Sequence, residues 1–152
     1  MQNGRSVIAP GDGSDGVEIV DVRDVAEFLI LAIDRSIYGV FNLTGRSMAY
    51  REFLNACKSA THSDAELVWM PLDYLRAQGI SAQDFPFLRP GSSIFRISSE
   101  KAYNAGWETR PFRDTAFDEL ASVTQVPRYP LHDTLPPDKQ EEVLKLWRNR
   151  AQ

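Results

Sequence analysis

Residues 22–34 restrict the fold of this chain more than any other stretch, because their apolar side chains fall on two sides of a helix. Phe28 lies off the main apolar stripe, and Leu31 falls on the charged side. A helix that is apolar on more than one side usually packs against more than one layer. We therefore expect this helix to lie between two layers. The main stripe, at helical spacing, consists of Val22, Val25, Ala26, Leu29 and Ile33.

Short strands and helices alternate along the rest of the chain. The fold class that this order predicts is α/β with mixed α+β character. One domain over residues 1–152 would hold a small sheet of short strands packed with several helices. Apolar and β-branched runs predict strands at 17–20, 39–44, 67–70 and 94–97, and a weak edge strand around 7–8. Periodicity, prolines and glycines predict helices at 22–34, 49–59, 72–78, 98–105, 110–120 and 138–150. The proline-rich residues 126–137 are predicted to wrap around the domain before the last helix.

Composition excludes several classes of protein. A net charge of −4 and a pI near 5.2 argue against a nucleic-acid binder, which normally has a basic face. The single cysteine, Cys57, cannot form an intramolecular disulfide and suits a reducing compartment. The longest apolar run, residues 28–33, is too short to span a bilayer, and the first residues lack the apolar core of a signal peptide. We therefore expect a cytoplasmic protein with no membrane or nucleic-acid partner.

Residues 11–16 read GDGSDG and match the G-x-G-x-x-G pattern of dinucleotide-binding loops. That loop works only where a helix follows it, because the helix amino terminus meets the pyrophosphate. Here a predicted strand follows, and the carboxylates of Asp12 and Asp15 would repel a phosphate. An acidic turn is the favoured interpretation, and no cofactor-binding residue is assigned.

Short-chain dehydrogenases need a tyrosine with a lysine four residues later, because the lysine lowers the pKa of the phenol. None of the five tyrosines has that lysine; the residues at this spacing are Asn42, Leu54, Gln78, Trp107 and Asp133. His62 and His132 belong to no cluster with metal-ligand spacing, and Cys57 falls on a predicted buried face. We therefore assign no catalytic residue and no metal site.

A polar cluster marks the start of helix 22–34. One interpretation makes Asp21 the helix N-cap, with an ion pair in the first turn, and this one is favoured. The other places the cluster at a strand-to-helix junction that faces a substrate cleft. Arginines elsewhere are weaker candidates, since a guanidinium can hold a phosphate or carboxylate, although a solvated or packing role is the alternative for each. The substrate-binding candidates are Asp21, Arg23, Asp24, Trp69, Arg89 and Arg96.

Five segments together carry a resemblance to a known family. They read, in order, VEIVDVRDVAEFLILAID, GVFNLTG, YREFLNAC, SSEKAYNAGWETRPFRDTAFDEL and PDKQEEVLKLW. They resemble the C-terminal, substrate-binding portion of the NAD-dependent epimerase/dehydratase family, the extended short-chain dehydrogenases/reductases. The resemblance covers nearly all of the chain. Two departures stand out: Ala49 replaces a frequent Ser or Thr at a helix cap, and the N-terminal Rossmann cofactor half is missing.

The resemblance implies a partial extended short-chain dehydrogenase domain that shapes a substrate pocket. The family's chemistry is NAD(P)-dependent epimerisation, dehydration or reduction of a nucleotide-sugar or similar carbonyl substrate. No cofactor is expected on this chain alone, and it is not expected to be catalytic alone. A cofactor-binding domain, or a second copy of the chain, would pack on the apolar helix 22–34. The alternatives are a stand-alone, non-enzymatic module that binds a small molecule or a protein, and a gene fragment without a selected function.

Overall fold

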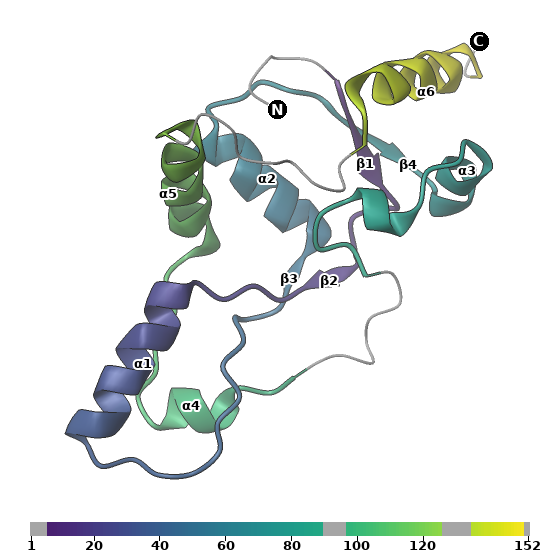
Figure 1. The fold of residues 1–152 in the computed structure, drawn as a ribbon. Helices are drawn as coiled ribbons and strands as arrows, with labels where there is room; N and C mark the ends of the chain where they lie inside the picture. The colour runs from purple at the N-terminus through teal and green to yellow at the C-terminus, as the bar shows by residue number, and fades with distance from the viewer. Residues whose placement is uncertain (1–5, 90–96, 126–134, 151–152) are drawn as a thin grey trace.

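A computed structural model describes residues 6–89, 97–125 and 135–150 of the chain. Within these ranges the fold is mixed α/β, as predicted, with six α-helices, one short 3-10 helix and four short strands (Figure 1). None of these helices combines the length and apolar character that a membrane span requires. The elements are β1 Val7–Pro10, β2 Gly16–Val17, α1 Val22–Asp34, β3 Met48–Ala49, α2 Tyr50–Ala60, β4 Leu67–Met70, α3 Leu72–Ala77, η1 Ala82–Asp84, α4 Glu100–Asn104, α5 Phe112–Gln125 and α6 Pro137–Asn149.

The strands pair in two small sheets. β1 and β4 run parallel, with Val7 opposite Leu67 and Pro10 opposite Met70. β2 and β3 run antiparallel over two residue pairs. The predicted edge strand near residues 7–8 is therefore real, and its partner is the predicted strand at 67–70.

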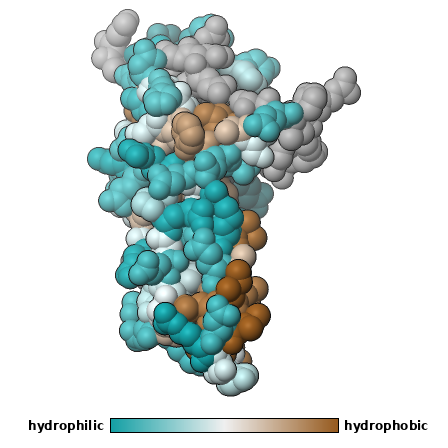
Figure 2. Space-filling model, turned by 90° about the vertical axis from the view of Figure 1, so that its left-hand side faces the viewer, coloured by the Kyte–Doolittle hydropathy of each residue, from teal (hydrophilic) through white to brown (hydrophobic). Residues whose placement is uncertain are grey.

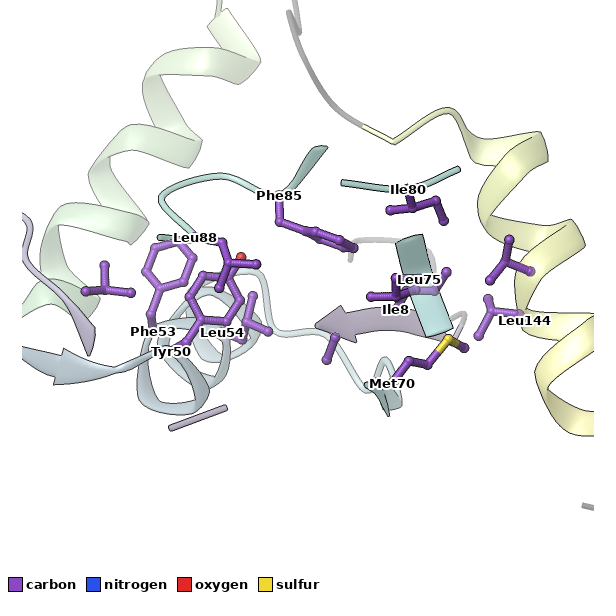
Figure 3. Close-up of a cluster of buried hydrophobic side chains, with 13 residues drawn as sticks. Ile8, Tyr50, Phe53, Leu54, Met70, Leu75, Ile80, Phe85, Leu88 and Leu144 are labelled. Atoms are coloured by element: carbon purple, nitrogen blue, oxygen red, sulfur yellow. The ribbon is translucent and has the colours of Figure 1, made fainter. Parts of the chain in front are cut away.

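Most buried apolar side chains form one main core around the β1–β4 pair and α2 (Figure 3). α2 contributes Tyr50, Phe53 and Leu54, as its helical spacing predicted, and α6 contributes Val143 and Leu144. α5 packs along α2, and α6 packs against β1. The main core consists of Ile8, Ala9, Val17, Tyr50, Phe53, Leu54, Met70, Leu75, Ile80, Phe85, Leu88, Val143 and Leu144.

A second, smaller group of buried side chains lies where α1, α4 and the segment before β3 meet (Figure 1). We call it the Phe28 cluster; its buried members are Phe28, Ala102 and Trp107. The ring of Phe28 meets those of Phe41 and Trp107 edge-on, with centroids 5.2 and 6.0 Å apart. Edge-to-face rings at such distances stabilise a pair beyond the area that they bury. The cluster therefore fixes the side of α1 that faces the rest of the chain.

The side of α1 that packs is not the main apolar stripe. Phe28, which lies off that stripe, is buried, whereas three large members of the stripe are exposed. Leu31 joins the Phe28 cluster from the charged side of the helix. The expectation that α1 has two apolar sides is confirmed, but among the described residues only one side has a layer to pack against.

Two strand predictions differ from the structure. Residues 39–44 form no strand, because no described strand lies beside them to complete a ladder. Of the strand predicted at 17–20, only Val17 belongs to a strand, which is β2. Beyond Val17 the ladder ends where Gly45 comes so close to Ile19 that a Cβ at position 45 would collide with the carbonyl oxygen. The strand at 94–97 and the wrapping segment at 126–137 lie mostly outside the described residues.

The start of α2 yields a test of local stability. Ala49 is the N-cap and has no side-chain acceptor, while Glu52 Oε2 already accepts from the Ala49 N–H at 2.9 Å. Ala49→Ser would complete the capping box, and we expect the free energy of unfolding to rise by about 1 kcal/mol. Urea denaturation measures this change.

The matched control is Ala26→Ser, an exposed position inside α1. There serine supplies no cap and should lower the free energy of unfolding by roughly 0.5 kcal/mol. A shift of the same sign for both variants would show that the missing cap is not what limits α2.

Candidate functional site

Asp21 caps α1 and is held by groups from two helices. Its Oδ1 accepts from the Arg23 backbone N–H and from Nε, both at 2.9 Å. Its Oδ2 accepts from Arg23 Nη2 at 2.7 Å and from Thr115 Oγ1 at 2.8 Å. The favoured interpretation of Asp21 as a helix cap with a first-turn ion pair is therefore confirmed. Thr115 belongs to α5, so the cap also ties α1 to that helix.

Asp24, one turn further on, is bound to the segment that leads into α5. Its carboxylate accepts from Arg110 Nε at 2.6 Å and from the Arg110 backbone N–H at 3.0 Å. Its carbonyl oxygen accepts from Trp107 Nε1 at 2.8 Å. Arg110 also reaches Glu27 with Nη2 at 3.2 Å. Arg110 thus anchors α1 at Asp24 and Glu27 to the segment before α5.

The electrostatics of this network follow from burial and pairing. The carboxylates of Asp21 and Asp24 are only 5% and 3% exposed. The hydrogen bonds from Arg23 hold the pKa of Asp21 far below its usual range, although burial acts in the opposite direction. The hydrogen bond to Asp24 raises the pKa of Arg110 in the same way. Asp21 is therefore charged at neutral pH.

A cavity of about 290 Å³ opens beside this network, between the start of α1, residues 45–48 and residues 109–112. Asp21, Asp24 and Arg110 line it, but their polar atoms are engaged with one another and with Arg23 and Thr115. Other polar groups of the lining make no hydrogen bond with a described residue, and these are available to a ligand. They are the side chains of Arg46, Ser47 and Thr109.

Arg46 is placed by an aromatic ring rather than by an acid. Its guanidinium lies 4.3 Å from the centroid of the Tyr103 ring. Such cation–π stacking orients the group while leaving its five N–H donors free for an anion. No sequence pattern indicated that Arg46, Ser47 and Arg110 lie together, because their proximity depends on how α1 crosses the chain before α5.

Two of the other predicted site residues, Trp69 and Arg89, do not line this cavity. Trp69, on β4, packs against Gly13 and lies under the guanidinium of Arg51 at 5.0 Å. Arg89 is exposed and donates from Nη1 to the Leu88 carbonyl at 2.9 Å. Arg96 lies outside the described residues. The structure therefore brings Asp21, Arg23 and Asp24 together and leaves Trp69 and Arg89 apart from them.

The glycine-rich residues 11–16 connect β1 to β2. Asp12 Oδ1 accepts from the backbone N–H of Ser14 at 2.9 Å and from its hydroxyl at 2.6 Å. A strand, β2, follows this turn, and the first N–H groups of α2, those of Tyr50 and Arg51, donate to the carbonyls of Asp15 and Gly13 at 2.8 and 3.0 Å. This arrangement is an acidic turn, which was the favoured interpretation.

Cys57 and the possible metal ligands offer no further reactive site in the described parts of the chain. Cys57 is partly buried on α2, and burial raises the pKa of its thiol to about 11, which disfavours the thiolate nucleophile. In the described parts of the chain, no three His, Cys, Asp or Glu side chains gather in a way that could hold a metal ion.

Comparison with known proteins links this fold to epimerases and related proteins. No family model and no curated protein matches the chain. Among solved structures, UDP-glucose 4-epimerase from Thermotoga maritima with UDP-glucose matches with a TM-score of 0.51 and 25% identity, over 83% of this chain and 38% of that one. RMD from Pseudomonas aeruginosa, complexed with NADPH, matches with a TM-score of 0.50 and 16% identity, over 82% and 37%.

The chain therefore shares the fold of part of these proteins and spans less than two fifths of the length of either. The predicted resemblance is supported at the level of an epimerase-like fold.

The buried network predicts a specific dependence on pH. An aspartate whose pKa is lowered on folding stabilises the protein above the unfolded pKa, about 3.9, and this contribution is lost as the pH falls towards the folded pKa. Asp21→Asn should lower the free energy of unfolding by about 2–4 kcal/mol at pH 7, because Arg23 and Thr115 then lose their charged acceptor. Urea denaturation from pH 7 down to pH 3 should show that difference shrinking below about pH 4.

Asp73→Asn is the matched control, because Asp73 pairs with Arg76 on the open surface of α3. It should change the free energy of unfolding by less than about 0.5 kcal/mol. A loss for Asp21→Asn that does not vary with pH would mean that the charge of Asp21 is not what stabilises the fold.

Proposed function

We propose that this chain is the substrate-binding portion of an NAD(P)-dependent epimerase, dehydratase or reductase, and that it does not catalyse by itself. The observation that carries the proposal is the likeness to UDP-glucose 4-epimerase over 83% of this chain but only 38% of the epimerase. A chain that corresponds to so small a part would leave the remaining functions to another part of the protein or to a partner.

The sequence supports this division of labour. A proton relay of the Tyr–Lys type needs a lysine four residues after a tyrosine, and none of the five tyrosines has one. The only G-x-G-x-x-G pattern leads into β2 and contains two acidic residues. Cofactor binding and proton transfer would therefore come from outside these residues, with NAD(P) held by the missing half.

The cavity beside α1 is the proposed substrate site. The substrate class we propose is a nucleotide sugar, whose diphosphate suits the guanidinium of Arg46. Ser47 and Thr109 would hydrogen-bond sugar hydroxyls from the same lining. Asp21, Arg23 and Asp24 would act by holding Arg110 and α5 in place as one wall of the cavity. Trp69 and Arg89 remain predicted ligand contacts outside this lining, and Arg96, which lies outside the described residues, remains a predicted contact.

Calorimetric titration of UDP-glucose into the isolated chain tests the proposal. We expect saturable binding, and roughly tenfold or greater weakening in Arg46→Ala, because a hydrogen bond to a charged group contributes about 1.5–3 kcal/mol. NADPH titrated under the same conditions should give no saturable heat. The matched control is Arg76→Ala, an exposed arginine on α3 that lies outside the cavity.

Two results would contradict the proposal. Micromolar binding of NADPH would show that a cofactor site is present in this chain. Absence of saturable UDP-glucose binding, or equal weakening by Arg46→Ala and Arg76→Ala, would show that the cavity is not a nucleotide-sugar site.

A further inference from the structure

The guanidinium of Arg46 lines the cavity without an acidic partner among the described residues. Arg110, the other arginine of the lining, is paired with Asp24 and Glu27 at 2.6 and 3.2 Å. A phosphate at Arg110 would have to displace a carboxylate, whereas at Arg46 it would not. The cation–π contact of Arg46 uses the charge of the guanidinium and takes up none of its N–H donors, so these are available for two phosphate oxygens.

The backbone that leads to Arg46 is held by α4. The Thr44 N–H donates to Ser99 Oγ at 2.9 Å, and the Thr44 carbonyl accepts from the Tyr103 hydroxyl at 3.4 Å. Ser99, the N-cap of α4, and Tyr103 are four residues apart, a spacing that places two side chains on one side of a helix. Both backbone groups of Thr44 are therefore bound from the same side of α4, two residues before Arg46.

The ring of Tyr103 is itself supported by Trp107. The two rings stack with centroids 5.1 Å apart and an interplanar angle of 18°. Trp107 is 3% exposed, and its Nε1 donates to the Asp24 carbonyl at 2.8 Å. The guanidinium of Arg46 lies 4.3 Å from the Tyr103 centroid. These three groups, which we call the Arg46 stack, connect the arginine of the cavity to the buried Phe28 cluster.

The exposed side of α1 carries apolar side chains rather than donors. Leu29, Ile30 and Ile33 lie there, 56%, 60% and 77% exposed, and Figure 2 shows a hydrophobic patch on the lower part of the molecule, where α1 lies. Apolar side chains donate no hydrogen bond to a phosphate. The buried side of the helix packs through Phe28 against Trp107, and the Arg46 stack is supported from there.

We propose that Tyr103 is a positioning residue of the substrate site: it keeps the guanidinium of Arg46 in one place before the substrate arrives, and so strengthens the binding of a diphosphate that it does not touch. Tyr103 is not among the residues that line the cavity. A long side chain that becomes ordered only on binding loses conformational entropy, and this cost lowers affinity. An arginine already held by a ring and by its backbone avoids most of that cost. The role in substrate affinity rests on the proposed function, whereas the ordering of Arg46 does not.

The first measurement needs no ligand. NMR relaxation of the arginine side-chain Nε–H groups gives an order parameter for Arg46 in the full chain. We expect Tyr103→Leu to lower it into the flexible range, below about 0.6, because the ring is lost. Tyr103→Phe keeps the ring and should keep Arg46 ordered. Tyr74→Leu is the matched control, since Tyr74 lies under the guanidinium of Arg150 at 4.7 Å, outside this cavity, and it should not alter the order parameter of Arg46.

The second measurement is calorimetric titration with UDP-glucose. Tyr103→Leu should weaken binding about two- to fivefold, the range that exposed cation–π contacts give. Tyr103→Phe should bind within about twofold of the wild-type chain, since it loses only the long hydrogen bond to Thr44. In a chain that already carries Arg46→Ala, Tyr103→Leu should weaken binding no further, because its effect passes through the guanidinium. Tyr74→Leu should bind like the wild-type chain.

The proposal is overturned if Arg46 is equally ordered in Tyr103→Leu, or if Tyr103→Leu weakens binding as much in the Arg46→Ala background as without it. A cooperative melting transition shows that each variant is folded. If Tyr103→Leu does not fold, pentafluorophenylalanine at position 103 takes its place, because that ring keeps its shape but loses the negative face that attracts a cation. Loss of Arg46 order in the variant, together with no UDP-glucose binding by the wild-type chain, would reject the substrate site and leave the positioning of Arg46 by Tyr103 standing.

Discussion

The ion network at the start of α1 joins the part of the structure around the Phe28 cluster to the part around the main core. Asp21 and Asp24 bind Arg23, Arg110 and Thr115, so the first turn of α1 is fixed to α5 and to the chain before it. Because these carboxylates are buried and paired, removing one partner would leave a charge without compensation. The direction in which α1 leaves the main core is set here. The cavity at its base and the apolar face along its length both depend on that direction.

The cavity and the apolar face of α1 suit different ligands. The cavity is small, and its lining combines apolar side chains with charged and hydroxyl groups, which suits a substrate with phosphates and hydroxyls. The exposed face of α1 is apolar, and the backbone groups of residues 41–43 form no hydrogen bond with another described residue, which suits a sheet. A substrate-binding portion that works with a cofactor-binding portion needs both kinds of surface. In this proposal the substrate and the cofactor half meet near the same helix.

The sequence predicted where the helices and strands lie better than it predicted which of them pack together. The spacing of Tyr50, Phe53 and Leu54 predicted the buried face of α2, and Asp21 was recognised as the cap of α1, because both signals are local. The main apolar stripe of α1 was equally clear, yet it faces solvent. An apolar stripe indicates that a helix face can be buried, but it does not show which other element buries it. Residues 39–44 have the composition of a strand, but a ladder requires a second strand that no local pattern supplies. The pairing of Asp24 with Arg110 spans 86 residues, and no local sequence pattern predicted it.

The central claim is that residues 39–44 have the sequence of a strand but no partner strand among the residues that the structure describes. Hydrogen–deuterium exchange of the isolated chain, followed amide by amide, measures this directly. If the claim is right, the amides of Phe41, Asn42 and Leu43 exchange at close to the rate of an unstructured chain, while those of β4, paired with β1, exchange far more slowly. Protection of residues 41–43 equal to that of β4 would mean that the strand is already paired within this chain, and the incomplete-fold interpretation would be wrong.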